Sequence, residues 1–203
     1  MDKSSIRSTF TSFTRNNLNG ELLKTWKKNK YIETGELKLT VYEYVPESLY
    51  SEYATLLTIL MNDIVRTDNR EYFEETAERA GQKMELFKKN GVKMLLLLLA
   101  GLNDLLVGMS IMLVYPGSTI ANQEMTGIIA QYRDKKLAAW LKAAMTEEAF
   151  HRFPSIDTIE TNCYEANKAM IHINETFGFT LKETSFQFEV DAEHVAKFGG
   201  ANL

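Results

Sequence analysis

The sequence predicts an α/β protein in which helices cover both faces of a central mixed, mostly antiparallel sheet. Two observations predict this class. Segments of strand length, with alternating or continuous apolar residues, are interleaved with longer segments whose apolar residues recur at helical spacing. Because strands and helices follow one another along the chain, the helices must bury their apolar sides against a shared sheet, on both of its faces.

The expected elements follow from local pattern. Apolar alternation or short apolar runs predict strands over 36–45, 92–99, 105–114, 126–130, 156–162 and 179–190, the last with a break near Glu183. Helical spacing predicts helices over 21–30, 47–65, 70–90, 137–150 and 166–177. A tight polar segment containing Gly101, Asn103 and Asp104 joins two of the apolar runs, which predicts a hairpin. Gly178 follows the last helix, where glycine commonly forms a left-handed cap.

Composition excludes several classes of protein. The chain has 203 residues, of which 45% are hydrophobic and 11% aromatic, which excludes a disordered or collagen-like chain. The single cysteine, Cys163, permits no internal disulfide, so we expect a reducing, cytoplasmic location. A net charge of −4 gives no global attraction to nucleic acid, and any basic site must be local.

The beginning of the chain differs from the rest. The first thirty residues contain seven Lys and Arg against two Asp and Glu, and we expect residues 1–35 to form an arm with a short basic helix beside a single domain over 36–203. A loosely ordered arm and an organelle transit peptide both fit the Ser- and Thr-rich start. The longest apolar stretch, Met94 to Leu102, is shorter than the roughly 20 residues of a membrane-spanning helix, so no membrane partner is expected.

The segment from Thr126 to Ala138 is the most informative junction. A strand leads into a turn that carries Arg133, Lys135 and Lys136 and opens the helix at 137. Helix N-termini present unsatisfied N–H groups and the positive end of the helix dipole, which together bind anions such as phosphate. The spacing of the basic residues alone is equally consistent with an ordinary solvent-exposed turn that binds no phosphate.

At this junction the sequence resembles the GNAT superfamily of acyl-CoA N-acyltransferases, whose pyrophosphate loop is written Q/R-x-x-G-x-G/A between a strand and a helix. Gln131 stands at the first position, and Arg133, Leu137 and Lys142 also match the pattern. Asp134 and Lys136 occupy the two glycine positions. A carboxylate repels a pyrophosphate, and a side chain restricts the approach of the backbone.

A second segment, 167–179, resembles the closing helix and turn of the same superfamily. Met170, Ile173 and Phe177 form one apolar stripe, while Asn167, Ile171 and Asn174 form an adjoining stripe that could face a cofactor. The resemblance covers roughly residues 36–190. It is most specific to the C-terminal half of two-domain GNAT proteins related to mycothiol synthase.

The resemblance implies acetyl-CoA as co-substrate and direct attack of an amine on the thioester. It implies main-chain contacts from the end of the cofactor strand, phosphate contacts from the turn and helix start, and pantetheine contacts from the last helix. The residues at these positions are Ile128, Ile129, Ala130, Gln131, Arg133, Asp134, Lys135, Lys136, Leu137, Ala138, Asn167 and Asn174.

Candidates for proton transfer are few. Glu124 precedes the cofactor strand and Glu160 lies in the next strand, so either carboxylate could serve as the general base. Asn174 stands where the family commonly has a tyrosine acid, and an amide can only hydrogen-bond the departing sulfur. Tyr164 is a nearby substitute in sequence. His172 has no second histidine at ligand spacing, so no metal site is expected.

Two functions of different classes remain open. The first is an acetyl-CoA-dependent N-acetyltransferase that acts on a primary amine of a small molecule. The second is a GNAT-like binding or interaction module without turnover, which the departures at Asp134, Lys136 and Asn174 favour. The surface around Tyr42, Tyr44 and the hairpin is a candidate homodimer face.

Overall fold

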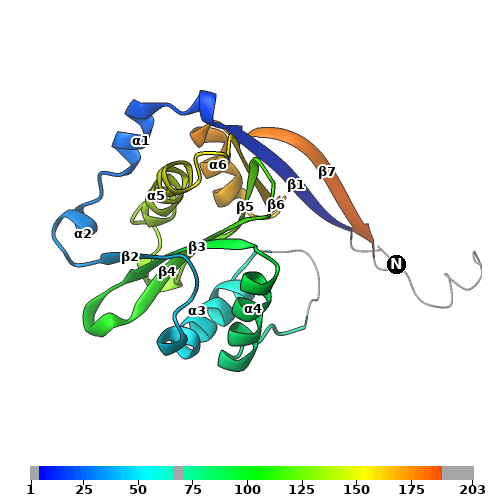
Figure 1. The fold of residues 1–203 in the computed structure, drawn as a ribbon. Coiled ribbons are helices and arrows are strands. Elements are labelled where there is room, and N and C mark those ends of the chain that lie inside the picture. Colours follow the sequence, from blue (N-terminus) through cyan, green and yellow to red (C-terminus); the bar gives the residue numbers. More distant parts are fainter. Residues whose placement is uncertain (1–4, 66–70, 189–203) are drawn as a thin grey trace, which may run out of the picture.

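The computed structural model describes residues 5–65 and 71–188, which form one seven-stranded sheet with helices on both faces (Figure 1). The strand order is β2-β3-β4-β5-β6-β1-β7, and all neighbours are antiparallel except β5 and β6. The predicted mixed, mostly antiparallel sheet is therefore confirmed. The strands are β1 (Ser5–Thr14), β2 (Lys38–Tyr42), β3 (Lys93–Ala100), β4 (Leu106–Val114), β5 (Ile120–Ile128), β6 (Thr158–Tyr164) and β7 (Thr180–Phe188).

The helices divide between the two faces. Those of the described residues are α1 (Gly20–Trp26), α2 (Lys30–Glu33), α3 (Tyr50–Asn62), α4 (Ala77–Lys89), α5 (Leu137–Arg152) and α6 (Lys168–Phe177). Helices α3 and α4 lie on one side of the sheet, and α1, α5 and α6 lie on the other (Figure 1). No helix in the described part of the chain is long and apolar enough to cross a bilayer.

Each face of the sheet buries its own hydrophobic core. Strand alternation sends Leu96 into the core beneath α3 and α4 and its neighbour Leu97 into the core beneath α5 and α6. Both side chains are fully buried. We call these the α3/α4 core and the α5/α6 core. Tyr42 and Tyr44 pack against the α3/α4 core, so their rings are partly used within the chain, and the homodimer stays a prediction.

The expectation of a loosely ordered N-terminal arm is wrong for residues 5–14. They form β1, which lies within the sheet between β6 and β7. Phe13 is fully buried, and its ring lies 5.2 Å from Phe177 and 5.3 Å from Phe179. The Ser and Thr residues of this segment break the apolar alternation by which a strand is recognised from sequence. The strand forms because β1 makes backbone hydrogen bonds with β6 on one side and β7 on the other. Residues 1–4 lie outside the described chain.

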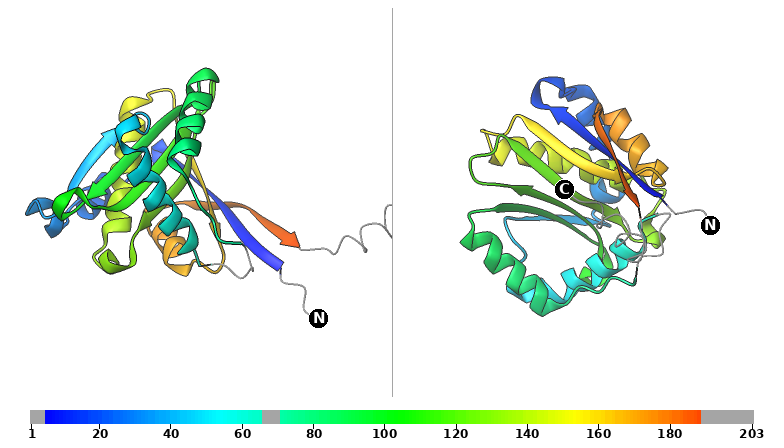
Figure 2. Two further views of the ribbon diagram at one scale, coloured as in Figure 1. Left: turned by 90° about the horizontal axis from the view of Figure 1, so that it is seen from below. Right: turned by 90° about the vertical axis from the view of Figure 1, so that its right-hand side faces the viewer.

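The last strand confirms the expected irregularity. Phe10 pairs with Glu183 while Thr11 pairs with Leu181, so Lys182 is the extra residue of a bulge. Strands β1 and β7 leave the body together as a twisted ribbon (Figures 1 and 2). The predicted strand end at 189–190 lies outside the described residues.

Most predicted boundaries shift by a few residues, and three elements differ most. The basic helix over 21–30 is two short helices, because Asn29 begins α2 as its N-cap. Helix α4 begins at Ala77 rather than 70, capped by the Thr76 hydroxyl, which accepts from the Arg79 amide at 3.2 Å. Strand β5 begins at Ile120 rather than 126, because its polar residues pair with both neighbouring strands.

Candidate functional site

The two parallel strands separate at the centre of the sheet. The ladder between β5 and β6 ends where Gln123 faces Thr161. Beyond this pair, β5 continues to Ile128 and β6 to Tyr164 without pairing to each other. The facing edges of β5 and β6 are therefore not paired to each other beyond this point, and we call this splayed part of the sheet the opening.

Glu124 lies at a bulge next to the point of separation. Neighbouring residues of β4, Ile111 and Met112, pair with Met125 and Gln123, which leaves Glu124 as the extra residue of β5. Its side chain is exposed, yet the surrounding protein desolvates the carboxylate and raises its pKa. A carboxylate with a raised pKa binds protons more readily near neutral pH, which suits a general base.

The main chain of Ile128 faces the opening. Ile129 donates its N–H to the Val107 carbonyl of β4 at 3.0 Å. Since successive residues of a strand direct their backbone groups to opposite sides, the N–H and carbonyl of Ile128 point away from β4. The carbonyl accepts from Arg133 Nε at 3.2 Å, and the N–H remains available to a ligand in the opening.

Two residues of the turn after β5 have the left-handed backbone that favours glycine. Asp134 has φ 61° and Lys136 has φ 58°, both in the left-handed region. These are the two positions at which the family pattern has glycine. Left-handed backbone is unfavourable for residues with a Cβ, by roughly 1–2 kcal/mol each. Asp134 and Lys136 therefore adopt the left-handed backbone that glycine favours, although each carries a Cβ that makes this conformation unfavourable.

The same turn presents a row of free amides. Within the described ranges, no group accepts a hydrogen bond from the backbone N–H of residues 134–139. Helix α5 begins at Leu137, whose buried side chain fixes the start of the helix over the sheet. Asp134 and Lys136 are exposed, and neither side chain has a hydrogen bond or ion pair in the described chain. The Asp134 carboxylate therefore accepts no hydrogen bond from these amides.

The other cations of the turn are partly engaged. Arg133 Nη2 lies 2.9 Å from Asp63 Oδ2, at the end of α3, so its guanidinium joins the turn to α3. The Lys135 ammonium lies over the rings of Tyr132 and Tyr31, at 4.6 and 4.9 Å from their centroids. The sequence predicted phosphate contacts for all three cations, and the structure leaves Lys136 as the one with no partner among the described residues.

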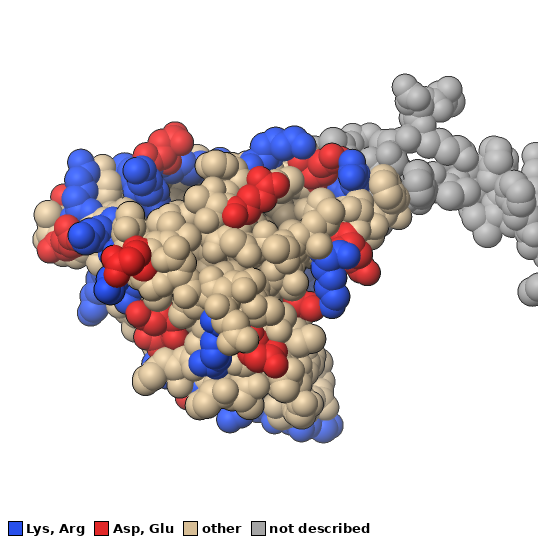
Figure 3. All heavy atoms as spheres, turned by 90° about the horizontal axis from the view of Figure 1, so that it is seen from above, with Lys and Arg blue, Asp and Glu red and all other residues tan. Residues whose placement is uncertain are grey.

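The surface over α1, α5 and α6 carries both signs of charge. Figure 3 shows basic and acidic side chains intermingled at the end of this face away from the termini, and much of the middle is uncharged. Ion pairs such as Lys24–Glu21 and Lys27–Glu147 account for part of this mixture. Among the described residues, no large patch of one sign of charge is visible on this face (Figure 3).

Helix α6 contributes two asparagines in different ways. Asn167 is the N-cap, and its Oδ1 accepts from the Met170 amide at 3.2 Å, so part of its side chain is used locally. Asn174 is 2% exposed, and its Oδ1 has no hydrogen-bond partner. A buried amide oxygen without a donor is unfavourable, and it suits a ligand that brings an N–H or S–H group.

A buried polar network at the base of the opening was not predicted. Lys142 on α5 is 1% exposed, and its ammonium donates to Gln123 Oε1 at 2.5 Å. Gln123 Nε2 in turn donates to Ser110 Oγ and Thr126 Oγ1, at 3.2 and 3.0 Å. Burial lowers the pKa of Lys142 to about 7. The network fixes the last residue of the β5–β6 ladder; the sequence pattern included Lys142 but gave no signal for its partners Gln123, Ser110 and Thr126.

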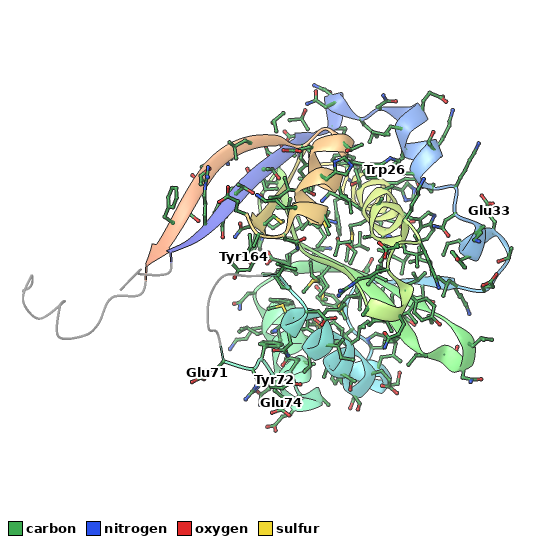
Figure 4. The ribbon with its side chains drawn as sticks, turned by 180° about the vertical axis from the view of Figure 1, so that it is seen from behind. Trp26, Glu33, Glu71, Tyr72, Glu74 and Tyr164 are labelled. Carbon is green, nitrogen blue, oxygen red and sulfur yellow. The ribbon has the colours of Figure 1, made fainter. Side chains whose placement is uncertain are left out.

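The remaining candidates are placed less favourably. Glu160 lies in the paired part of β6, and its Oε1 accepts from Lys182 Nζ at 2.6 Å. Tyr164 ends β6 and lies, in Figure 4, between the β1–β7 ribbon and the α3–α4 layer. His172 is exposed. Cys163 is buried, and this burial raises its pKa to about 11, which disfavours a thiolate nucleophile.

A cavity of about 590 Å³ lies elsewhere, between α5 and the segment that leads to β2. Lys27, Leu37, Trp140 and Glu147 are among its lining residues. It is separate from the turn after β5, and none of the predicted site residues lines it.

Solved structures show what this arrangement resembles. A tandem GNAT protein from the clavulanic acid biosynthesis pathway aligns with a TM-score of 0.71 at 16% identity, over 92% of this chain and 55% of that one. A GCN5-related N-acetyltransferase from Sphaerobacter thermophilus aligns with a TM-score of 0.57 at 12% identity, over 90% and 51%. An acetyltransferase of the GNAT family from Streptococcus pneumoniae aligns with a TM-score of 0.55 at 14% identity, over 75% and 100%.

These alignments establish the fold. The chain has the GNAT fold, as the sequence resemblance predicted. It spans 51–61% of the length of the first three structures it matches. Neither a family sequence model nor a curated protein sequence matches the chain.

Proposed function

We propose that the protein is an acetyl-CoA-dependent N-acetyltransferase that acts on a primary amine of a small molecule. The observation that carries the proposal is the turn from Gln131 to Lys136. It follows a splayed strand, holds left-handed backbone at both glycine positions of the family pattern, and presents free amides at the start of α5. This combination suits a diphosphate.

The residues around the opening fit acetyl-CoA as co-substrate. The amides of residues 134–139 and the Lys136 ammonium would hold the diphosphate. The unpartnered Oδ1 of Asn174 would accept from an N–H or S–H group of the pantetheine arm. When bound, acetyl-CoA supplies an activated thioester, and the Ile128 N–H would donate to its carbonyl oxygen.

The chemistry then requires few side chains. The amine nitrogen forms the amide bond as the carbon–sulfur bond breaks, and the products are an N-acetylated amine and CoA. Glu124 would take the proton that the ammonium loses, because it lies beside the point where β5 and β6 separate, and its raised pKa suits this role better than the ion-paired Glu160. Its exposed negative charge also attracts a cationic acceptor. Asn174 hydrogen-bonds but cannot protonate the sulfur, so solvent would supply that proton.

A second candidate function is a GNAT-fold binding module without turnover. Two observations favour this module. Arg133 forms an ion pair with Asp63, and both glycine positions of the family pattern carry side chains. For either function we propose a cytoplasmic location, with a small molecule rather than nucleic acid or membrane as partner.

The test is acetyl transfer by the purified chain to a panel of small primary amines, followed by mass spectrometry of the products. We expect an acetylated amine and release of CoA, both reduced in the Glu124→Gln variant, which keeps the shape of the side chain but takes no proton. Binding of CoA without transfer to any amine would favour the binding module instead.

A further inference from the structure

The segment from Gly20 to Glu33, which contains α1 and α2 and which we call the strap, lies against α5 and the turn before it. Trp140 Nε1 of α5 donates to the Lys27 carbonyl at 2.9 Å, and Lys27 forms an ion pair with Glu147. The Trp26 ring packs 5.1 Å from the Phe177 ring of α6 (Figure 4). The strap is thus anchored to both helices of this face.

Asn29 connects the strap to the turn directly. Its Oδ1 accepts from the Tyr31 amide at 3.1 Å, which caps α2. Its Nδ2 donates to the Lys135 carbonyl at 2.8 Å. The side chain is buried, with 7% of the residue exposed, so water competes little for either bond.

Lys135 is the residue between the two left-handed positions. Its carbonyl is held by Asn29, and its ammonium lies over the ring of Tyr31 in the same strap. Asp134 and Lys136 carry side chains that disfavour the backbone they adopt. A contact that fixes the peptide between them therefore holds both in the unfavourable conformation.

We propose that Asn29 is a positioning residue for the diphosphate, which replaces the conformational role of the missing glycines by holding the Lys135 carbonyl. This inference rests on the proposed function. Asn29 acts on the ligand only through the backbone of the turn, whose amides are aligned when its bond to Lys135 is made.

The test compares two Asn→Asp substitutions at helix N-caps. Asn29→Asp keeps the acceptor for the Tyr31 amide but removes the donor to Lys135. Asn19→Asp makes the same chemical change at the N-cap of α1, where the side chain only accepts, from the amides of Glu21 and Leu22. Calorimetric titration with CoA measures the Kd, and titration with pantetheine, which lacks the diphosphate, provides the selective readout.

We expect Asn29→Asp to weaken CoA binding about tenfold, with pantetheine binding and the Asn19→Asp variant unchanged. If Asn29→Asp does not fold, Asn29→Ser replaces it, because a serine side chain can cap α2 but is too short to reach the Lys135 carbonyl. In the Asp134→Gly background the loss should shrink to about threefold, since glycine adopts left-handed backbone without strain. A loss of the same size in both backgrounds, or equal losses for CoA and pantetheine, would overturn the inference.

The failure of the inference differs from the failure of the proposed function. If the unsubstituted chain binds CoA and Asn29→Asp binds it equally well, only the inference is overturned. If the unsubstituted chain does not bind CoA, the proposed function fails and the inference fails with it.

Discussion

The two faces of the sheet bury different kinds of side chain. The α3/α4 core contains one buried carboxylate, Glu75, and both of its oxygens have partners, from Lys83 and from the Thr76 amide. The α5/α6 core contains the Lys142 network, and the buried side-chain oxygens without partners in the described chain, those of Thr11, Thr146 and Asn174, lie on this side of the sheet. Buried polar groups without partners therefore accumulate on the α5/α6 side of the sheet.

This difference suggests that the α3/α4 core mainly determines stability, while the other face mainly determines ligand binding. Apolar burial stabilises the α3/α4 core, and among the residues that the structure describes, the unpartnered buried side-chain oxygens lie on the other side of the sheet. A buried amine and unpartnered oxygens reduce the stability of the α5/α6 core. Substitutions in the α3/α4 core should then lower the stability without changing the affinity for CoA. Substitutions of the site residues on the other face should change the affinity with little effect on stability.

The largest expected effect is on stability alone. Leu96→Ala removes a fully buried side chain from the α3/α4 core and should lower the free energy of unfolding by about 2–5 kcal/mol. Denaturant unfolding measures this loss. The Kd of the folded variant for CoA should equal that of the unsubstituted chain, and a large change in Kd would break the separation of the two faces.

The second prediction concerns pH. Lys142 titrates near 10.5 when unfolded and near 7 when folded, so between these values the unfolded chain binds more protons. The free energy of unfolding should therefore rise from pH 7 toward pH 10, by up to about 1.4 kcal/mol per pH unit. The Lys142→Gln variant, which cannot titrate but can still donate to Gln123, should lose this rise.

Lys89→Gln is the matched control, because Lys89 is exposed on α4. Its profile should follow that of the unsubstituted chain. If Lys142→Gln and Lys89→Gln give the same pH profile, the buried lysine is not the group responsible.

A smaller effect is expected at Asn174. Replacement by Leu removes an unpartnered oxygen and adds apolar volume, so stability should change by no more than about 1 kcal/mol. The affinity for CoA should fall several-fold because the acceptor is lost. Thermal unfolding and calorimetry together test this, and unchanged CoA affinity would remove Asn174 from the site.

The smallest expected effect is a gain. Asp134→Gly removes a negative charge from the turn and relieves left-handed strain, and it should strengthen CoA binding by a few-fold. Asp104→Gly provides the control, because Asp104 has φ 57° in the exposed β3–β4 hairpin, away from the site. An unresponsive Asp134→Gly variant would favour a module whose opening does not accept CoA.

The sequence predicts the parts of the fold whose signal is local. The apolar runs of β3 and β4, the helix after the basic turn and the cap at Gly178 were all found from spacing and turn chemistry. Strand β1 was missed because its stability comes from pairing with β6 and β7, more than 140 residues away, which no local pattern of Ser and Thr reveals.

The site residues stay predictions. The turn from Gln131 to Lys136 and the asparagines of α6 were identified from the resemblance to the GNAT superfamily. The bond from Asn29 to Lys135, the partner of Arg133 and the network at Lys142 join residues that are distant in sequence. Only the fold brings them together.

The central claim is that the turn from Gln131 to Lys136 binds a diphosphate. Thermal unfolding with saturating CoA, 3′-phosphoadenosine diphosphate or pantetheine tests it most directly. At about 100 times its Kd, CoA should add roughly 2.7 kcal/mol of stability, and the nucleotide fragment should stabilise the chain more than pantetheine does. An unfolding temperature that none of the three ligands raises would contradict the claim.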